Sequence, residues 1–362
     1  MAIVDLTRRA RLATLVSAAA NAVPFALRLA LAAALAWPAA AHAETAMHFT
    51  LDRKIDGPVT PFFLAIDKGY FKAEGLDVTV DTAAASPVDA LNRVAAGKDQ
   101  MGVADINVLI QMRDAAATPI KALFIVFDKP AYAIIARKSR GIAAPRNLVG
   151  KKVAAPAADP AVAQWPVFAK VNDIDPAKVM LENVGLPVRE PMLAAGEVDA
   201  VIGSSFTSYV DLKARGVPPD DLAILPMADY GLVLYGDAIV VAAKFAEEKP
   251  EAVRAFVLAY LQALRETVRD PARAIDALLR RTEGVKKEIE LERLRMAIRD
   301  NIVTPAVRSN GYGAIDPARF AAAIDQIALG YRFKAKETAA AAFDASFLPQ
   351  AAQRSMDDTA SR

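Results

Sequence analysis

The chain has 362 residues, of which 54% are hydrophobic and 24% charged, and its formal net charge is +2. This composition excludes a disordered chain, and the lack of cysteine excludes disulfides, thiolate metal sites and a lipid-bearing N-terminal cysteine. No basic patch stands out, so nucleic acid and anionic membrane surfaces are not expected partners. Alanine is abundant and aromatic residues are few, which favours helices packed on sheets and therefore an α/β fold class.

The first 43 residues have the pattern of a secretory signal peptide. Arg8 and Arg9 precede an apolar run over residues 29–37, and Ala41-His42-Ala43 forms a small-x-small cleavage site. An uncleaved membrane anchor is the alternative, but the apolar run is shorter than the roughly 20 residues that a bilayer span needs. We therefore expect cleavage before Glu44 and a protein free in the periplasm. Sec and twin-arginine export both stay open.

Strands and helices alternate after the leader. Thr60 is placed to cap a helix whose first residue is Pro61, and Ser86 is placed to cap the next one, which closes at Gly97. Strands are predicted over 47–51 and 76–81 and before Asp105. This order is typical of an open parallel sheet whose helices all begin at one edge.

One helix-strand unit occurs twice. The helix end at residues 94–97, followed by a strand over 101–105, resembles the helix end at 193–196, followed by a strand over 198–203. Chance is the alternative, because helices often end in Ala-Gly. Two such units predict two α/β lobes, each near the usual size of a domain.

The chain must cross between the lobes at least twice. The apolar runs Ala131–Ala136 and Ala238–Ala242 are predicted to be strands that leave one sheet and enter the other. The predicted lobe 1 comprises residues 44–134 and 240–349, and lobe 2 comprises residues 135–239. Helices predicted over 250–268, 271–281, 286–300 and 317–329 are expected to pack on lobe 1. The polar tail from Gln350 is expected to be disordered.

Residues 61–78 (PFFLAIDKGYFKAEGLDV) resemble the opening signature of the SsuA/THI5-like (NMT1) substrate-binding proteins, which serve importers of nitrate, sulfonate, taurine and thiamine pyrimidine. Shorter similarities follow in the expected order at 195–200, 228–231 and 245–251. The resemblance implies a type II periplasmic-binding-protein fold: two α/β lobes, a two-strand hinge and a small-molecule ligand in the cleft. It also implies, as partners, the permease and ATPase subunits of an ABC importer. We expect a monomer.

Ligand contacts are expected where helix N-termini and strand ends meet the cleft, because unpaired backbone N–H groups point inward there. Capping of the adjacent helix is the alternative role for each hydroxyl, amide or carboxylate, whereas Phe206 could stack on a ring. The candidates from these segments are Thr60, Asp105, Asn107, Asp159, Ser204, Ser205, Phe206 and Thr207.

Three further candidates lie near the predicted lobe 2. Tyr230 and Tyr235 flank the return crossing and could close the edge of the cleft, or pack in the core instead. Arg189 is the candidate cation for a carboxylate or sulfonate, with a solvated surface arginine as the alternative. Asp159 places negative charge at a helix N-terminus and disfavours an anion there. We expect a small, polar, planar or heterocyclic ligand of pyrimidine type, neutral or cationic; an organic sulfonate, taurine, nitrate or a carboxylate is the second choice.

Catalysis is the alternative of another class, because some family relatives make the thiamine pyrimidine. The resemblance implies that this chemistry needs a histidine, a cofactor lysine and a cysteine-rich iron site. This chain has no cysteine, and His48 is its only histidine beyond the leader. No hydrolase, zinc-protease or phosphate-loop motif occurs. We therefore expect a binding protein without cofactor or metal; a ligand-sensing partner of a membrane receptor is a further alternative.

Overall fold

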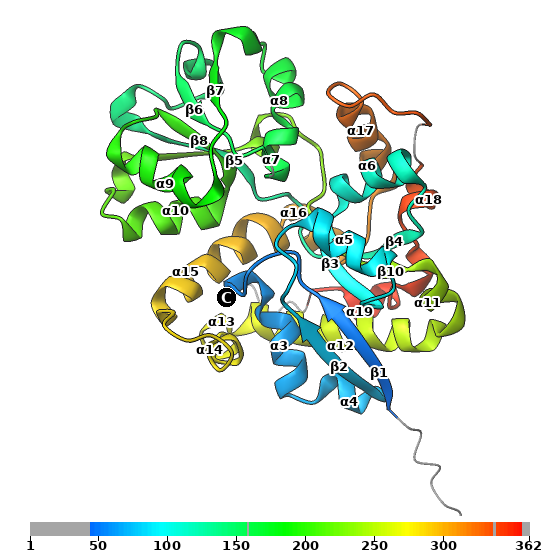
Figure 1. Cartoon of the computed structure of the whole chain (residues 1–362). Helices are drawn as coiled ribbons and strands as arrows, with labels where there is room; N and C mark the ends of the chain where they lie inside the picture. Colours follow the sequence, from blue (N-terminus) through cyan, green and yellow to red (C-terminus); the bar gives the residue numbers. More distant parts are fainter. Residues whose placement is uncertain (1–43, 158, 336–337, 357–362) are drawn as a thin grey trace, which may run out of the picture. The chain divides into compact units, whose positions relative to one another are not determined.

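A computed structural model describes residues 44–157, 159–335 and 338–356, and Figure 1 shows the chain. The predicted signal peptide lies outside the described residues. Residues 44–362 form one compact unit, which contains two five-stranded sheets packed against helices. The α/β fold class is therefore confirmed. Among the described residues, no helix is both long enough and apolar enough to cross a membrane.

The two sheets have the same arrangement. In the first, with strand order β2-β1-β3-β10-β4, β1 pairs in parallel with β2 and β3, and β10 runs antiparallel to β3 and β4. In the second, with order β7-β6-β8-β5-β9, β6 pairs in parallel with β7 and β8, and β5 runs antiparallel to β8 and β9. The strands are β1 (Thr45–Thr50), β2 (Leu76–Asp81), β3 (Met101–Asp105), β4 (Ile120–Ile125), β5 (Tyr132–Arg137), β6 (Lys152–Ala154), β7 (Met180–Glu182), β8 (Ala200–Ser204), β9 (Leu222–Pro226) and β10 (Asp237–Ala242).

We call the part built on the first sheet lobe 1 (residues 44–125 and 237–356) and the part built on the second lobe 2 (residues 132–226). Lobe 1 contains α3 (Thr60–Asp67), α4 (Tyr70–Ala73), α5 (Pro87–Ala95), α6 (Ile106–Ala116), α11 (Ala243–Glu248), α12 (Pro250–Arg269), α13 (Pro271–Ala274), α14 (Asp276–Leu279), α15 (Lys287–Ala297), α16 (Pro305–Asn310), α17 (Pro317–Ile327), α18 (Ala339–Ala342) and α19 (Ala351–Arg354). Lobe 2, drawn mainly in green in Figure 1, contains α7 (Pro160–Ala163), α8 (Trp165–Val171), α9 (Leu186–Ala195) and α10 (Ser205–Ala214).

The repeated unit is confirmed. Strands β3 and β8 hold the same central place in their sheets, and each follows a helix, α5 or α9. Gly97 lies two residues after the end of α5 and Gly196 directly after α9, with φ of +69° and +77°, a conformation that glycine adopts without steric cost. At the other end of α5, the Ser86 side chain accepts a hydrogen bond from the Asp89 N–H at 3.2 Å, as its position before Pro87 predicts.

The crossings lie beside the predicted strands and not within them. Strand β5 belongs wholly to the second sheet and β10 wholly to the first, so the chain passes between lobes through residues 126–131 and 227–236. The predicted lobe boundaries at 134/135 and 239/240 are therefore wrong, because they fall inside these strands. An apolar run identifies a buried strand but does not show to which sheet it belongs.

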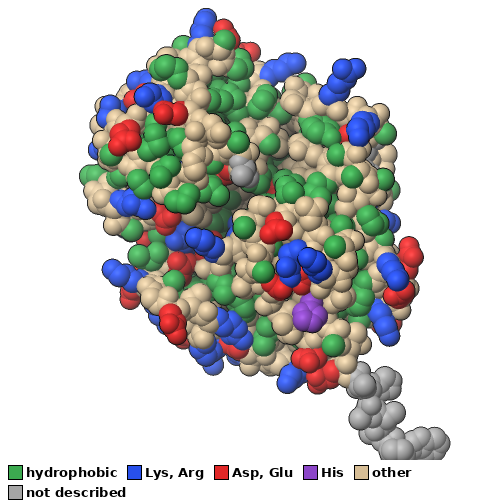
Figure 2. Space-filling view, in the orientation of Figure 1, with side chains coloured by type: hydrophobic (Ala, Val, Ile, Leu, Met, Phe, Trp, Pro, Cys, Tyr) green, Lys and Arg blue, Asp and Glu red, His purple; other side chains and the backbone are tan. Residues whose placement is uncertain are grey.

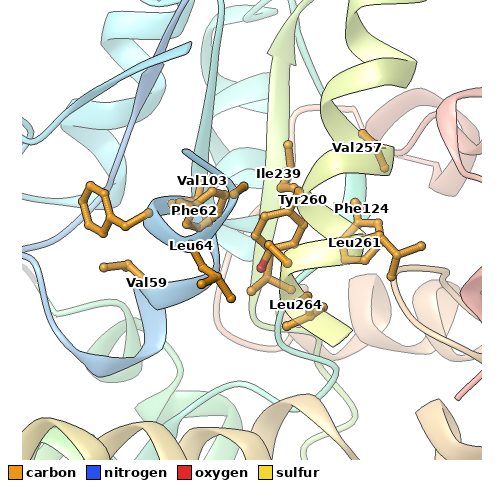
Figure 3. Close-up of a cluster of buried hydrophobic side chains, with 14 of the residues drawn as sticks. Val59, Phe62, Leu64, Val103, Phe124, Ile239, Val257, Tyr260, Leu261 and Leu264 are labelled. Carbon is orange, nitrogen blue, oxygen red and sulfur yellow. The ribbon is translucent and has the colours of Figure 1, made fainter. Parts of the chain in front are cut away.

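Aromatic side chains fill the core of lobe 1. In Figure 3, Phe62 of α3 and Phe124 of β4 lie on either side of Tyr260 of α12. Their ring centroids are 4.5 Å and 5.6 Å from that of Tyr260. Burial of each such ring contributes on the order of 2 kcal/mol to folding. This packing holds the C-terminal helices on lobe 1, as predicted.

Two local predictions are wrong. Thr60 does not cap α3, because a turn of 3-10 helix (Gly57–Val59) precedes it and Thr60 is already helical. Residues 350–356, the described part of the predicted tail, are ordered: they contain α19, and the N–H of Tyr312 donates to the carbonyl of Arg354 at 2.9 Å. A polar composition alone did not reveal these backbone contacts.

The helices predicted over 250–268 and 317–329 form α12 and α17, whereas two other predicted helices are interrupted. The segment predicted over 271–281 splits into α13 and α14, and α15 ends in a π-helical turn, Ile298–Ile302. None of these changes alters the helices that border the cleft.

Candidate ligand-binding cleft

A cavity of about 310 Å³ lies between the lobes, next to the two crossings. Figure 2 shows the hollow between lobe 2 and lobe 1 on this face of the molecule. Phe127, Pro130 and Ala131 of the outgoing crossing form part of its wall, and Leu186 contributes from the start of α9. Apolar walls with a few polar groups are typical of small-molecule sites.

Acidic side chains exceed basic ones along this cavity. Its cationic residues are Arg53, Lys54 and Arg189. Its aspartates are Asp52, Asp56, Asp105, Asp159 and Asp237. The cavity therefore favours a ligand that brings hydrogen-bond donors or positive charge.

Arg53 neutralises part of this acidity. Its Nε donates to Asp52 at 2.8 Å, and its guanidinium also donates to Oδ2 of Asp237. Burial opposes the charge of Arg53, but the two carboxylates outweigh that effect and raise the pKa of the guanidinium. Arg53 is thus held charged between Asp52 and Asp237.

Asp105 ends β3 and caps α6. Its Oδ1 accepts from the N–H groups of Asn107 (2.8 Å) and Val108 (3.2 Å), and its Oδ2 accepts from the hydroxyl of Tyr132. Burial raises the pKa of Asp105 although these hydrogen bonds oppose the shift, and burial together with Asp105 raises the pKa of Tyr132. The Asn107 side chain donates to the Tyr132 hydroxyl (3.0 Å) and to the carbonyl of Tyr235 (2.7 Å). This network joins lobe 1 to the first residue of β5 in lobe 2.

Arg189 is buried at 4% exposure and is not a solvated surface arginine. Its guanidinium donates to Asp159 at 2.6 Å and to Glu190 at 2.8 Å, and also to the carbonyl of Ile202 at 3.1 Å. It lies over Gly203, where an added Cβ would come within 2.4 Å of Nη1. Burial works against the charge of Arg189, but Glu190 and Asp159 raise the pKa of its guanidinium. The guanidinium of Arg189 is therefore already paired with carboxylates of the protein itself.

Asp56 differs from the other aspartates in having few partners. Its Oδ1 is buried and accepts no hydrogen bond from the described residues. Burial raises the pKa of Asp56 to about 6, although the charges of Arg53 and Arg293 oppose the shift. Asp56 is therefore a cavity carboxyl whose pKa, about 6, lies above the usual value for an aspartate.

A protein-family model matches the sequence across parts of both lobes. Residues 57–274 match the model described as "NMT1/THI5 like". The chain belongs to the NMT1/THI5-like family. The resemblance predicted from residues 61–78 is thereby confirmed.

Two proteins with similar sequences have names that refer to a pyrimidine. The 4-amino-5-hydroxymethyl-2-methylpyrimidine phosphate synthase THI13 of Saccharomyces cerevisiae is 28% identical over 228 residues, which cover 59% of this chain and 64% of the yeast protein. The formylaminopyrimidine-binding protein of Halalkalibacterium halodurans is 26% identical over 250 residues, which cover 66% of this chain and 72% of that protein. The chain thus matches less than two thirds of the yeast protein's length.

Solved structures show the fold. The alkanesulfonate-binding protein SsuA of Xanthomonas axonopodis pv. citri, bound to MOPS, matches with a TM-score of 0.62 and 17% identity, covering 83% of this chain and 98% of that chain. The periplasmic aliphatic sulphonate-binding protein SsuA of Escherichia coli matches with a TM-score of 0.64 and 14% identity, covering 81% and 94%. The predicted periplasmic-binding-protein fold is confirmed.

In this NMT1/THI5-like protein, some of the predicted ligand residues line the cavity. They are Asp105, Asp159, Arg189, Ser204 and Thr207. Three of the residues there cap helices: Asp105 caps α6, Asp159 caps α7 and Ser204 caps α10. Three helix N-termini at the cavity are therefore already supplied with acceptors, whereas α9, which begins at Leu186, has no side-chain cap.

The other predicted residues do not line it. Phe206 is fully buried against Phe127, with ring centroids 6.0 Å apart, and Ser205 is buried in the first turn of α10. The hydroxyl of Thr60 is buried and accepts no hydrogen bond from the described residues. Asn107 is buried behind Asp105.

Both tyrosines near the return crossing pack in the protein. Tyr230 lies edge-on to Phe168 at 6.5 Å, and Tyr235 packs on Phe320 at 6.0 Å. The Tyr235 hydroxyl accepts from the N–H of Asp316 at 2.9 Å. The core-packing alternative holds for both side chains.

Several lining residues were missed by sequence reasoning. Two sequence features mark most of them: the charged loop that follows β1, and the aspartate at the start of the apolar strand β10. The missed polar residues are Asp52, Arg53, Lys54, Asp56, Tyr132 and Asp237. Among the described residues, no cluster of His, Asp or Glu could hold a metal ion.

Proposed function

We propose that this chain is the periplasmic solute-binding component of an ABC importer and that its cleft captures a small nitrogen heterocycle rich in N–H donors. The observation that carries the proposal is the acidic cavity between the lobes, in which Arg53 and Arg189 are both paired with aspartates. A donor-rich or cationic ligand offsets this charge, whereas an anion adds to it.

The capped helix ends support the same ligand class. An anion prefers bare N–H groups at a helix N-terminus. The N–H of Asn107 donates to Asp105 and that of Ala161 to Asp159, so carboxylates occupy these positions already. The pyrimidine names of two relatives agree with this charge pattern. The sulfonate names of the structural relatives favour an anion, which is the second choice.

The cavity volume favours a single-ring ligand. Ligand pockets commonly range from roughly 300 to 1,000 Å³, and about 310 Å³ is at the small end of this range. Closure would proceed by rotation of the lobes about residues 126–131 and 227–236, and the ligand would shift the population toward the closed state. The permease and ATPase would then engage the closed monomer.

Binding is favoured over catalysis. His48 lies on the exposed face of β1 and does not line the cavity, and the chain has no cysteine. The synthase THI13 matches this chain in sequence over 228 residues, so the distinction between binding and catalysis needs a direct measurement.

A thermal-shift screen of the purified protein tests the ligand class. We expect aminopyrimidines to raise the Tm and taurine, ethanesulfonate and nitrate to leave it unchanged; a ligand at a hundred times its Kd adds about 2.7 kcal/mol. Mass spectrometry after overnight incubation should recover the stabilising ligand unchanged. Stabilisation by the anions alone would contradict the ligand class, and conversion of the ligand would contradict a binding role.

A further inference from the structure

Asp237 lies where the two crossings meet. It is the first residue of β10, and its carbonyl accepts from the N–H groups of Val126 (2.8 Å) and Phe127 (3.1 Å) in the outgoing crossing. The N–H of the preceding Gly236 donates to the carbonyl of Phe127 at 2.9 Å. The backbone of Asp237 therefore ties both connecting segments together, while its side chain lines the cavity.

Asp237 and Asp105 are register partners on neighbouring strands, yet their oxygens are used differently. Both oxygens of Asp105 accept hydrogen bonds from protein groups, including the Tyr132 hydroxyl. Asp237 accepts from Arg53 on Oδ2, whereas Oδ1 accepts no hydrogen bond from the residues that the structure describes. Asp105 is thus occupied within the protein, and Asp237 keeps one free acceptor.

A free carboxylate oxygen in a closing cleft needs a donor. When the lobes exclude water, an unpaired buried acceptor costs roughly 1–3 kcal/mol, and more if it is charged. Asp159, on the opposite wall, already accepts from Arg189 and from the N–H of Ala161. A ligand that brings an N–H group into the cavity would supply a donor for Asp237, beside the protein donors Lys54, Ser204 and Thr207 that also line it.

We propose that Asp237 determines ligand specificity by accepting an N–H of an exocyclic amino group, or of a protonated ring nitrogen, through Oδ1. This inference rests on the proposed function and narrows it to aminated nitrogen rings. Arg53 on Oδ2 fixes the orientation of the carboxylate, and Asp105 on the adjacent strand holds the lobes at the same point. The ligand is thereby anchored at the pivot that both lobes share.

Discrimination between an amino and an oxo ring tests this role. Burial raises the pKa of Asp237, and the charge of Arg53 opposes this shift. When Asp237 is ionised, an oxo group leaves two acceptors facing each other, so the aminated ring is expected to bind more tightly. We expect the wild-type protein to bind 4-amino-5-hydroxymethyl-2-methylpyrimidine at least tenfold more tightly than its 4-oxo analogue, as measured by isothermal titration calorimetry. Equal or tighter binding of the oxo analogue overturns the proposal without any variant.

The variant Asp237→Asn provides the second measurement. Its amide presents a donor as well as an acceptor, so the tenfold preference should fall to less than threefold while the protein remains folded. Asp77→Asn, which removes the same charge on the exposed face of β2, should keep the preference. An unchanged preference in Asp237→Asn overturns the role of Asp237 alone. If the wild-type protein binds sulfonates and no aminopyrimidine, the proposed function fails as well.

Discussion

The hydroxyl of Tyr132, the first residue of β5 in lobe 2, donates a hydrogen bond to the carboxylate of Asp105 at the end of β3 in lobe 1. Both side chains are buried, at 6% and 2% exposure. The two sheets are thus joined by a side-chain contact beside the crossings as well as by the chain itself. Closure of the cleft has to occur around this contact.

Loss of that hydroxyl should weaken the protein measurably. We expect Tyr132→Phe to lower the free energy of unfolding by about 2 kcal/mol, because a buried carboxylate loses a hydrogen bond. Urea unfolding followed by circular dichroism measures this change. Tyr331→Phe is the control, since Tyr331 also donates to an aspartate, Asp114, but at a more exposed site. Equal losses in the two variants would contradict a special role for the interlobe contact.

Removal of Arg189 should be far more costly than removal of a surface arginine. Arg189→Ala leaves Asp159 and Glu190 without their cation in a buried setting, so we expect a loss of about 3–5 kcal/mol in unfolding free energy. Arg299 pairs with Asp300 on the surface with 68% of its side chain exposed, and Arg299→Ala should change stability little. If Arg189 were free to bind an anionic ligand, its removal would abolish sulfonate binding with little effect on folding.

The raised pKa of Asp56 predicts that the free energy of unfolding of the protein falls as the pH rises. Its pKa is raised from 3.8 to about 6 by burial, so the folded state holds the proton more tightly than the unfolded state. The protein is therefore expected to lose stability between about pH 4 and pH 6, by up to about 3 kcal/mol from this group. Asp56→Asn does not titrate in this window.

Unfolding curves of both proteins at several pH values measure the effect. The stability of Asp56→Asn relative to wild type should increase from pH 4 to pH 7, while that of Asp77→Asn should show no such trend. If the difference in unfolding free energy between Asp56→Asn and the wild type did not change with pH, the pKa of Asp56 would not be raised in the folded protein.

The end of the chain should contribute to stability, because α19 is tied to lobe 1. The N–H of Tyr312 donates to the Arg354 carbonyl, and the Arg354 guanidinium donates to the carbonyls of Tyr312 (3.0 Å) and Pro349 (2.9 Å). Truncation after Pro349 is expected to lower the unfolding free energy by about 2 kcal/mol. Ser355→Ala, which removes only an exposed local hydrogen bond, should be nearly neutral. A truncated protein as stable as the full chain would restore the prediction of a disordered tail.

Local signals in the sequence predicted the elements of the fold well. The alternation over 76–81 coincides with β2, and Ser86-Pro87 marks the start of α5. The two glycines after α5 and α9 identified the repeated unit. Such features depend on neighbours within a few residues and on backbone conformation, so they can be recognised without knowledge of tertiary packing.

The site was harder to predict, because its contacts join distant segments. Arg53 meets Asp237, which lies 184 positions further along the chain, and Arg189 meets Asp159 from 30 positions away. Sequence position also does not show which way a side chain points from a helix or loop. Phe206 and Tyr235 were therefore predicted at the cleft, whereas both are buried in the core.

The preference of the cavity for a nitrogen ring over an anion is measured most directly by competition calorimetry on the purified protein. 4-Amino-5-hydroxymethyl-2-methylpyrimidine is titrated in the presence and absence of taurine, and the experiment is repeated with ethanesulfonate and nitrate. We predict one site per chain, a Kd for the aminopyrimidine at least tenfold below that of each anion, and no competition at equimolar anion. Tighter binding of a sulfonate, with displacement of the pyrimidine, would contradict the proposed function.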